Sequence, residues 1–341
     1  MNRILEVNDL KVSFHTYAGE VKAVRGTSFY LDEGETLALV GESGCGKTVT
    51  AKAIMRMLGK SRSEIKAGSQ VFFNGEDVLS MPKKRLNALR GKDISMIFQD
   101  PMTSLNPTMT IGDQIAESLE IHKKLKKKAA MEEVIQLLEM VNIPNARERV
   151  RSYPHQLSGG MRQRVMIAIA LACGPKILIA DEPTTALDVT IQAQIIDLLK
   201  ELKSELKTAI ILVTHDLGVV ADFADRIQVM YGGQIVESGN KHEIFANCQH
   251  PYTWALMSSI PGDEIKSKGE LYSLKGTPPD LMLDIPGCPF ASRCQYCMEI
   301  CKEAPPAKTA LSGTHSVSCW LRHELAPKVE NPLKARGGKN E

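Results

Sequence analysis

The sequence predicts an α/β protein in which a mainly parallel sheet is flanked by helices. Three short apolar runs, residues 36–40, 177–180 and 209–214, are typical of strands that are buried on both faces. A helical pattern around residues 191–206 separates the second run from the third. Because strands that alternate with helices usually form parallel sheets, this order of elements supports the prediction.

The remaining segments extend this fold class. Residues 4–14 alternate as an edge strand does, and residues 21–31 and 94–98 are also expected to be strands. Residues 100–172 are predicted to be mostly helical, because apolar positions such as Val134, Leu137, Leu138 and Val141 fall on one helical face. The lysine-rich run at residues 123–128 favours a solvated helix end or loop over contact with lipid headgroups.

Size and composition limit the possible classes of protein. The 341 residues are 43% hydrophobic and 24% charged, enough for one large domain with a smaller appendage. The net charge of +2, from 42 basic and 40 acidic side chains, gives no electrostatic case for a nucleic-acid partner. The first residues lack an apolar stretch of signal-peptide length, and no run of about 18 apolar residues occurs. We therefore expect a soluble, cytoplasmic chain whose membrane attachment comes through partners.

Residues 41–48, Gly-Glu-Ser-Gly-Cys-Gly-Lys-Thr, fit the phosphate-binding pattern G-x-x-x-x-G-K-[ST] of P-loop NTPases. The pattern lies between the first buried strand and a helix expected to begin near Lys47. Glycines let backbone N–H groups curl around phosphate oxygens, while Lys47 can reach the β- and γ-phosphates and Thr48 can bind Mg²⁺. The predicted nucleotide contacts of this loop are Gly41, Ser43, Gly44, Cys45, Gly46, Lys47, Thr48 and Val49.

Two carboxylates complement this loop. The apolar strand at residues 177–180 delivers Asp181 to its end, where the side chain can hold Mg²⁺ through water. Glu182 follows directly and can act as the general base that polarises the attacking water. The sequence therefore predicts an ATP-hydrolysing site.

Four further motifs carry a family resemblance. Residues 157–161, Leu-Ser-Gly-Gly-Met, resemble the signature motif of ABC ATPases. Gln99 resembles the Q-loop glutamine of that family, residues 186–188 (Ala-Leu-Asp) resemble its D-loop, and His215 resembles its switch histidine. Together with the two earlier motifs, they occur in the family's order and cover about residues 4–240.

The resemblance implies a role for each of these residues. Ser158, Gly159 and Gly160 would begin a helix that contacts the γ-phosphate bound to an opposing subunit. Asp188 of the D-loop is also expected to be a nucleotide-binding residue. His215 would contact the γ-phosphate, and Gln99 would sense the metal and the water. Tyr17 would stack on adenine, although Phe14 and a plain packing role remain alternatives. Glu182, His215 and Gln99 are thus the expected catalytic residues, with ATP and Mg²⁺ as cofactors.

Other segments resemble the peptide and nickel importers of this family, and the C-terminal extension resembles the oligopeptide and dipeptide importers in particular. These segments are residues 99–107, 153–156 (Tyr-Pro-His-Gln), 250–253 (His-Pro-Tyr-Thr) and 276–279 (Gly-Thr-Pro-Pro). The resemblance implies an ATPase subunit at the cytoplasmic face of the cell membrane that drives peptide uptake. Its expected partners are two integral-membrane permease subunits, a second homologous ATPase and, indirectly, an extracytoplasmic peptide-binding protein. A homodimer of ATPase subunits remains an alternative to the heterodimer.

Five cysteines gather between residues 288 and 319. In the peptide-importer family this pattern implies a [4Fe–4S] cluster, with Cys288, Cys294, Cys301 and Cys319 as its four thiolates. Zn²⁺ would use the same ligands, and Cys297 is a possible substitute for one of them. Cys173 is expected to belong to the core.

The predicted organisation is an ABC ATPase domain at residues 1–245, with its helical subdomain at about 100–172. A cysteine-rich C-terminal extension at 246–325 and a flexible tail at 326–341 follow. Alternatives for the function are the same motor acting on nickel or another small solute, and a redox-regulated ABC ATPase. ABC ATPases of translation or DNA repair fit less well, because they typically carry two cassettes or a long coiled-coil insertion.

Overall fold

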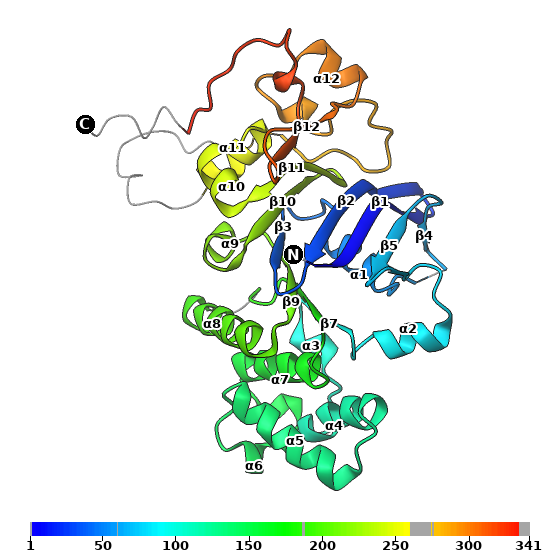
Figure 1. The fold of residues 1–341 in the computed structure, drawn as a ribbon, viewed down its shortest axis with the longest axis vertical. Helices are drawn as coiled ribbons and strands as arrows, with labels where there is room; N and C mark the ends of the chain where they lie inside the picture. The colour runs from blue at the N-terminus through cyan, green and yellow to red at the C-terminus, as the bar shows by residue number, and fades with distance from the viewer. Residues whose placement is uncertain (1, 60, 186–187, 260–273, 275, 334–341) are drawn as a thin grey trace, which may run out of the picture. The chain divides into compact units, whose positions relative to one another are not determined.

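A computed structural model describes residues 2–59, 61–185, 188–259, 274 and 276–333. It confirms the predicted α/β class and divides into two compact units (Figure 1). The first unit comprises residues 1–5, 31–36 and 73–213, and the second comprises residues 6–30, 37–72 and 214–341. Each unit is described below by itself. Among the helices of the described ranges, none is long and apolar enough to cross a membrane.

The first unit is built on three parallel strands, β7 (Ile94–Ile97), β8 (Ile177–Asp181) and β9 (Ala209–Thr214). β8 lies between the other two, with Ile177 opposite both Ile94 and Ala209. Every residue of these strands is buried, which explains why the sequence shows continuous apolar runs rather than alternation. The prediction of parallel buried strands is confirmed for these segments.

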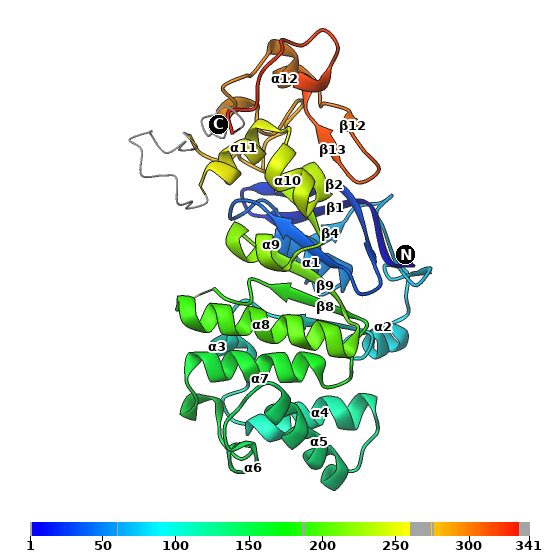
Figure 2. The same cartoon turned by 60° about the vertical axis from the view of Figure 1, so that its left-hand side comes forward.

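Helices make up most of the rest of the first unit. The stretch from residue 100 to 172 is mainly helical, as expected, and α4, α5, α6 and α7 pack on one another (Figure 2). The helices of this unit are α2 (Lys83–Leu89), α3 (Pro101–Ser104), α4 (Ile111–His122), α5 (Lys127–Met140), α6 (Ala146–Arg149), α7 (Gly159–Leu171) and α8 (Val189–Leu206), with the 3₁₀ turn η1 (Pro154–Gln156) and the short strand β6 (Glu76–Asp77).

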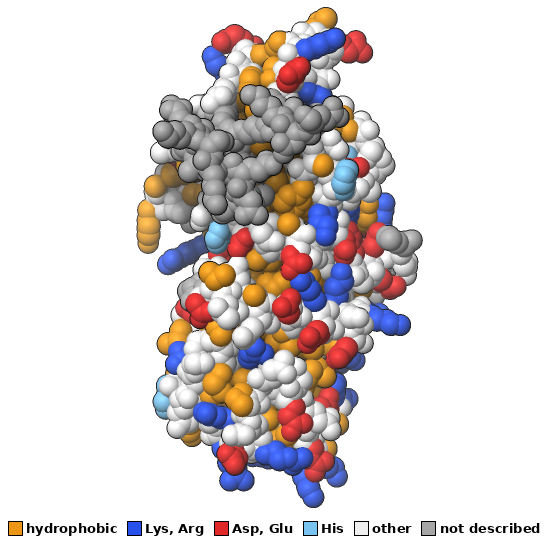
Figure 3. Space-filling view, turned by 90° about the vertical axis from the view of Figure 1, so that its left-hand side faces the viewer, with side chains coloured by type: hydrophobic (Ala, Val, Ile, Leu, Met, Phe, Trp, Pro, Cys, Tyr) orange, Lys and Arg blue, Asp and Glu red, His pale blue; other side chains and the backbone are white. Residues whose placement is uncertain are grey.

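The lysine-rich run lies where α4 ends and α5 begins. Lys123, Lys124 and residues 126–128 are exposed, in agreement with the expected solvated helix end or loop. Lys and Arg side chains gather at the lower end of the face shown in Figure 3, which α5 and α6 form. Lys123 forms an ion pair with Glu133 of α5.

The second unit contains two groups of strands. One holds β1 (Arg3–Thr16), β2 (Gly19–Asp32), β4 (Ser63–Ile65) and β5 (Gln70–Phe73). β1 lies between β2 and β5 and also pairs with β4, so the expectation of an edge strand was wrong. Alternation of apolar residues indicates that one face of the strand is buried. It does not indicate whether the strand is hydrogen-bonded to neighbours on one edge or on both.

The other group is less parallel than the sequence predicted. β3 (Thr36–Val40) pairs in parallel with β10 (Arg226–Tyr231), but β10 pairs antiparallel with β11 (Gln234–Asn240). The strands β13 (Ser316–Ser318) and β12 (Lys308–Ala310) extend this sheet, again antiparallel. The helices of this unit are α1 (Lys47–Ile54), α9 (Leu217–Phe223), α10 (Lys241–Asn247), α11 (Pro251–Ser258) and α12 (Glu299–Glu303), with the 3₁₀ turns η2 (Ala291–Arg293) and η3 (Trp320–Arg322).

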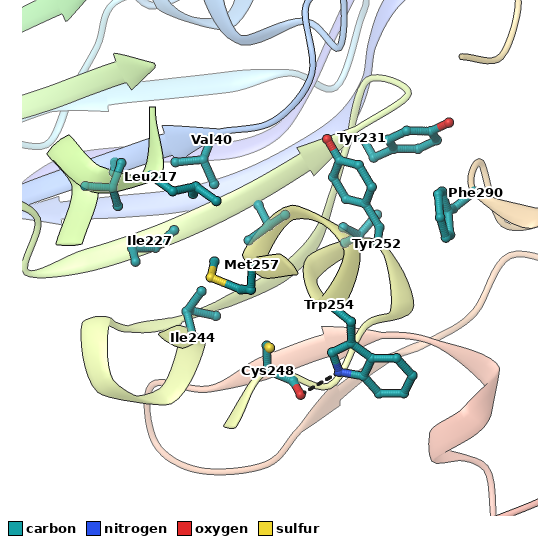
Figure 4. Close-up of a cluster of buried hydrophobic side chains, with 14 of the residues drawn as sticks. Val40, Leu217, Ile227, Tyr231, Ile244, Cys248, Tyr252, Trp254, Met257 and Phe290 are labelled. Carbon is teal, nitrogen blue, oxygen red and sulfur yellow. Dashed lines mark hydrogen bonds between the residues drawn. The ribbon is translucent and has the colours of Figure 1, made fainter. Parts of the chain in front are cut away.

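A hydrophobic core joins β3, β10 and α11 to the cysteine-rich segment (Figure 4). Tyr231, Tyr252 and Phe290 are its largest fully buried side chains. The indole N–H of Trp254 donates to the carbonyl of Cys248 at 2.8 Å, so the one polar atom of this ring is satisfied inside the core.

The part of the predicted tail that the structure describes is packed rather than loose. Val329 and Leu333 pack against this core, and the buried Asn331 amide donates to the Cys248 carbonyl at 3.0 Å. The segment was predicted to be a flexible tail because most of its residues are polar, and the composition does not show that these three side chains pack against the core. Residues 334–341 of the predicted tail lie outside the described residues.

Candidate functional site

The phosphate-binding pattern forms a tight loop between β3 and α1. Gly46 precedes the first helical residue with a φ of 102°, a backbone conformation that L side chains rarely adopt. A Cβ on Gly46 would lie 2.5 Å from the carbonyl oxygen of Ala23, and one on Gly41 would lie 2.1 Å from that of Met230. Glycine is therefore required at both positions by backbone that approaches from outside the loop.

Lys47 is held over this loop by the loop's own carbonyls. Its ammonium donates to the carbonyl of Gly41 at 2.7 Å and to that of Glu42 at 3.0 Å, and the side chain is buried. The positive charge therefore lies inside the curl of backbone that a phosphate group would enter. The other residues predicted to contact nucleotide divide by exposure: Ser43 and Gly44 are exposed, Thr48 and Val49 are half-buried in the first turn of α1, and Cys45 is buried.

Burial raises the pKa of the Cys45 thiol, an effect only partly offset by the nearby Lys47 charge. The thiol therefore remains neutral and acts as a small apolar side chain in the loop.

The acidic residues lie at the end of β8. Asp181 is 1% exposed. Glu182 follows with a φ of 48°, which is unusual for a non-glycine residue, and its N–H donates to the Val213 carbonyl at 2.8 Å. Such a strained backbone persists only where the surrounding structure fixes it, and it is frequent at functional sites.

Two side chains orient the Glu182 carboxylate. Its Oε2 accepts a hydrogen bond from the Gln99 amide at 2.9 Å and another from the Thr185 hydroxyl at 2.9 Å. The structure therefore brings together Gln99 and Glu182, two residues that the sequence predicted to be catalytic. Thr185 was not predicted, since a single threonine two residues beyond Pro183 gives no sequence signal.

The predicted signature motif lies at the start of α7. Ser158 caps this helix by accepting from the Met161 N–H at 3.3 Å, and Ser158 and Gly159 are exposed. A helix N-terminus with exposed backbone N–H groups attracts anions. A Cβ on Gly160 would lie 3.0 Å from Cγ2 of Ile191, so α8 packs closely against the start of α7.

Gln163 connects this helix to the acidic turn. The side chain is 2% exposed, and its amide donates to the Pro183 carbonyl, one residue after Glu182, at 2.6 Å. Sequence analysis did not assign this residue to the site. The signal that identifies it is a long polar side chain buried on a helix, which requires a fixed hydrogen-bond partner.

The remaining predicted residues lie as follows. His215 is exposed directly after β9, and Asp188 caps α8 by accepting from the Ile191 N–H at 2.9 Å. Tyr17 is fully exposed in the turn between β1 and β2. Ala186 and Leu187 of the predicted D-loop lie outside the described residues. The phosphate loop and His215 belong to the second unit, whereas Asp181, Glu182, Gln99 and the signature motif belong to the first.

Three of the four predicted cysteine ligands have raised thiol pKa values. Burial is the main cause that raises the pKa of Cys288 and Cys294 to about 12, and the charges of Cys301 and Cys319 raise it further. Burial is also the main cause that raises the pKa of Cys319 to about 11, with a further contribution from Cys301. Across the described part of the chain, no group of three or more His, Cys, Asp or Glu side chains converges closely enough to hold a metal ion.

The backbone around these cysteines is tightly folded. The Cys288 N–H donates to the Cys301 carbonyl at 2.7 Å, and a Cβ on Gly287 would lie 2.1 Å from that same oxygen. Glycine is therefore needed beside Cys288 for the two cysteine segments to approach. The pKa of Cys297 is also raised, mainly by burial. Cys173 donates to the Ser118 carbonyl at 3.5 Å in the first unit and is not part of this group.

A glycine loop with an inward lysine before a helix, and a buried strand that ends in Asp-Glu, define a P-loop nucleoside triphosphatase. The family follows from comparison with known proteins. Residues 24–185 match the family model described as ABC transporter, and residues 236–301 match the one described as the C-terminal region of oligopeptide/dipeptide transporters. The chain is 54% identical to the oligopeptide transport ATP-binding protein OppD of Bacillus subtilis, over 97% of this chain and 92% of that protein. It is also 53% identical to the dipeptide transport ATP-binding protein DppD of the same organism, over 96% and 97%.

The chain therefore belongs to the ABC transporter family of ATP-binding proteins. Solved structures agree with this assignment. The ATP-binding cassette MJ0796, in a dimeric post-hydrolysis state bound to ADP and Pi, is 25% identical with a TM-score of 0.63, over 70% of this chain and 99% of that one. CbiO1 from Clostridium perfringens is 28% identical with a TM-score of 0.61, over 72% and 92%. The chain is an ATPase, and ATP and Mg²⁺ are the cofactors that fit its family.

Proposed function

We propose that this chain hydrolyses ATP to drive uptake of oligopeptides or dipeptides through membrane permeases. The observation that carries the proposal is the match of residues 236–301 to the C-terminal region of oligopeptide/dipeptide transporters, together with relatives that are peptide transport ATP-binding proteins along nearly their full length. Nickel or another small solute as cargo, and a redox-regulated ATPase of other function, are not favoured by these relatives.

The proposed chemistry is positioning and neutralisation of charge. Lys47 and the loop N–H groups bind the phosphates, and Thr48 and Asp181 hold Mg²⁺. Glu182 accepts the proton of the attacking water, while Gln99 fixes its carboxylate by the observed hydrogen bond.

The other predicted residues complete the nucleotide site. His215 contacts the γ-phosphate, and Tyr17, exposed in its turn, stacks on adenine. The N-terminal end of α7, with Ser158, Gly159 and Gly160, closes on the nucleotide of an opposing ATPase subunit, beside Asp188. This arrangement explains why Ser158 and Gly159 are exposed here.

The partners follow from the proposed function. We expect two integral-membrane permeases, a second homologous ATPase and an extracytoplasmic peptide-binding protein, with this chain attached peripherally at the cytoplasmic face of the membrane. Residues 1–245 form the ATPase domain, about 100–172 its helical subdomain and 246–325 the extension. A single ATPase polypeptide that sustains full transport without a second one would contradict the heterodimer.

Uptake measurements test the function. Cells that lack this chain are expected to lose uptake of a radiolabelled di- or tripeptide and to retain uptake of ⁶³Ni²⁺. Expression of the intact chain should restore peptide uptake. Loss of nickel uptake with normal peptide uptake would contradict the proposed cargo.

We also propose that Cys288, Cys294, Cys301 and Cys319 hold a [4Fe–4S] cluster. Four soft thiol groups within one short segment are a donor set suited to such a cluster, which binds them as thiolates. When bound, the cluster would cross-link the cysteine segments through Fe–S bonds.

Metal analysis of protein purified without oxygen tests this assignment. We expect about four irons and four sulfides per chain with broad absorbance near about 400 nm. Cys301→Ser should abolish the iron content, whereas Cys173→Ser, the matched control in the first unit, should leave it unchanged. Retention of iron in Cys297→Ser would exclude that residue as a ligand. Stoichiometric zinc in a colourless protein would contradict the cluster.

A further inference from the structure

Glu42 is the second residue of the phosphate loop, and its carboxylate, its backbone N–H and its backbone carbonyl all form hydrogen bonds. Its carboxylate accepts from both terminal nitrogens of Arg293, at 2.6 and 3.1 Å. Its N–H donates to the Tyr252 hydroxyl at 2.8 Å, and its carbonyl accepts from the Lys47 ammonium at 3.0 Å. The loop's conformation at Glu42 is therefore set by two residues from outside the loop and is linked to Lys47.

Arg293 comes from the cysteine-rich extension, 251 residues beyond Glu42 in the sequence. It ends the turn η2, between Cys288 and Cys294, and its side chain is only 4% exposed. It also donates to the Tyr231 hydroxyl at 3.1 Å and to the Leu274 carbonyl at 3.3 Å. The Glu42 carboxylate is the main cause that raises the pKa of Arg293, so the guanidinium is a permanent charge.

An aromatic cluster fixes the position of these groups. The rings of Tyr252 and Tyr231 have centroids 4.5 Å apart, and each lies within 5.4 Å of the Phe290 ring (Figure 4). Phe290 belongs to the same segment between Cys288 and Cys294 as Arg293. Both side chains that bond Glu42 are thus held by one buried cluster that the extension completes.

Backbone contacts bring the same segments together. A Cβ on Gly232, in the turn between β10 and β11, would lie 2.8 Å from Cβ of Pro289 in the extension. The next residue, Gly233, donates its N–H to the Cys45 carbonyl of the phosphate loop at 3.1 Å. In this turn, Gly232 therefore contacts the extension, and Gly233 contacts the phosphate loop.

We propose that Arg293 is a positioning residue of the ATPase, which holds the phosphate loop in its nucleotide-binding conformation through the paired hydrogen bonds to Glu42. The paired geometry restrains both the position and the orientation of the carboxylate. Because the Glu42 carbonyl also receives the Lys47 ammonium, displacement of Glu42 displaces the group that binds the β- and γ-phosphates. The extension thereby contributes directly to nucleotide affinity. The inference rests on the ATPase activity and is independent of both the cargo and the proposed cluster.

Nucleotide binding by variants of the full-length chain tests this role. Arg293→Met is expected to raise the KM for ATP, and the dissociation constant of a fluorescent ATP analogue, by about tenfold. The kcat at saturating ATP should change by less than about twofold, because the Glu182 site is untouched. Arg293→Lys should give an intermediate loss, since a lysine retains the charge without the paired geometry.

A double-mutant cycle assigns the effect to the Glu42 contact. Glu42→Gln alone should weaken nucleotide binding, and the Arg293→Met/Glu42→Gln double variant should be no weaker than the worse single variant. Lys302→Met, which removes an exposed cation from the same extension, is the matched control and should bind ATP normally.

Two outcomes would overturn the proposal. Additive losses in the double variant would show that Arg293 does not act through Glu42. A fall in kcat with an unchanged KM, accompanied by a lower melting temperature, would show that Arg293 only stabilises the fold. Glu42 is partly exposed, at 25% of its side chain, so Glu42→Gln is expected to fold and to keep the proposal testable if Arg293→Met does not.

Discussion

Glu182→Gln is expected to lower the rate of ATP hydrolysis by at least about a hundredfold, while ATP binding persists. The substitution keeps the size of the side chain and removes its capacity to accept a proton from water. The hydrogen bonds from Gln99 and Thr185 reach Oε2 in the native protein and can still be accepted by the amide oxygen of glutamine. The variant should therefore lose ATP hydrolysis while the geometry of the nucleotide site is preserved.

Steady-state ATPase assays and size-exclusion chromatography in ATP and Mg²⁺ measure this result. Because hydrolysis is blocked after binding, the variant should accumulate as an ATP-bound dimer of ATPase subunits. Glu139→Gln, at an exposed position of α5, is the matched control and should hydrolyse ATP at the normal rate. Near-normal hydrolysis by Glu182→Gln would mean that another group is the base.

The second large effect concerns Lys47. Lys47→Ala is expected to weaken ATP binding by about a hundredfold, because a charged hydrogen-bond donor to the phosphates contributes about 1.5–3 kcal/mol. The native ammonium is buried and already directed into the loop by the carbonyls of Gly41 and Glu42, so little ordering is needed when a phosphate arrives.

Equilibrium binding of a fluorescent ATP analogue, with melting temperatures measured in parallel, tests this prediction. Lys52→Ala removes a lysine from the same helix, at a position away from the phosphate loop, and should bind the analogue normally. A Lys47→Ala protein that is folded and binds with unchanged affinity would contradict the assignment of Lys47 to the phosphates.

The conformation of the phosphate loop depends on residues of the second unit that lie outside the loop motif, Arg293 and Tyr252. The sequence identifies the loop because its whole pattern of glycines, lysine and threonine lies within eight consecutive residues. It does not identify Arg293, whose partner Glu42 lies 251 residues away and whose neighbours in sequence are cysteines. The cysteines of the extension form a recognisable sequence pattern, but it is the Arg293 guanidinium that contacts the loop directly.

The sequence by itself determined the features that depend on consecutive residues. Buried strands such as β8 appear as apolar runs, the Asp181-Glu182 pair follows directly from the end of one of them, and the helical character of residues 100–172 follows from periodicity. The run of lysines at residues 123–128 likewise indicated a solvated helix end or loop. Each of these features is encoded by neighbours along the chain.

Only the tertiary structure decided which strands and side chains meet. The position of β1 beside β5 and the packing of Leu333 against the core join segments far apart in the sequence. The same holds for Gln163 with Pro183 and for Arg293 with Glu42. Such contacts depend on how the whole chain folds. The type of a residue determines how many hydrogen bonds it can form, but it does not determine which residue is the partner.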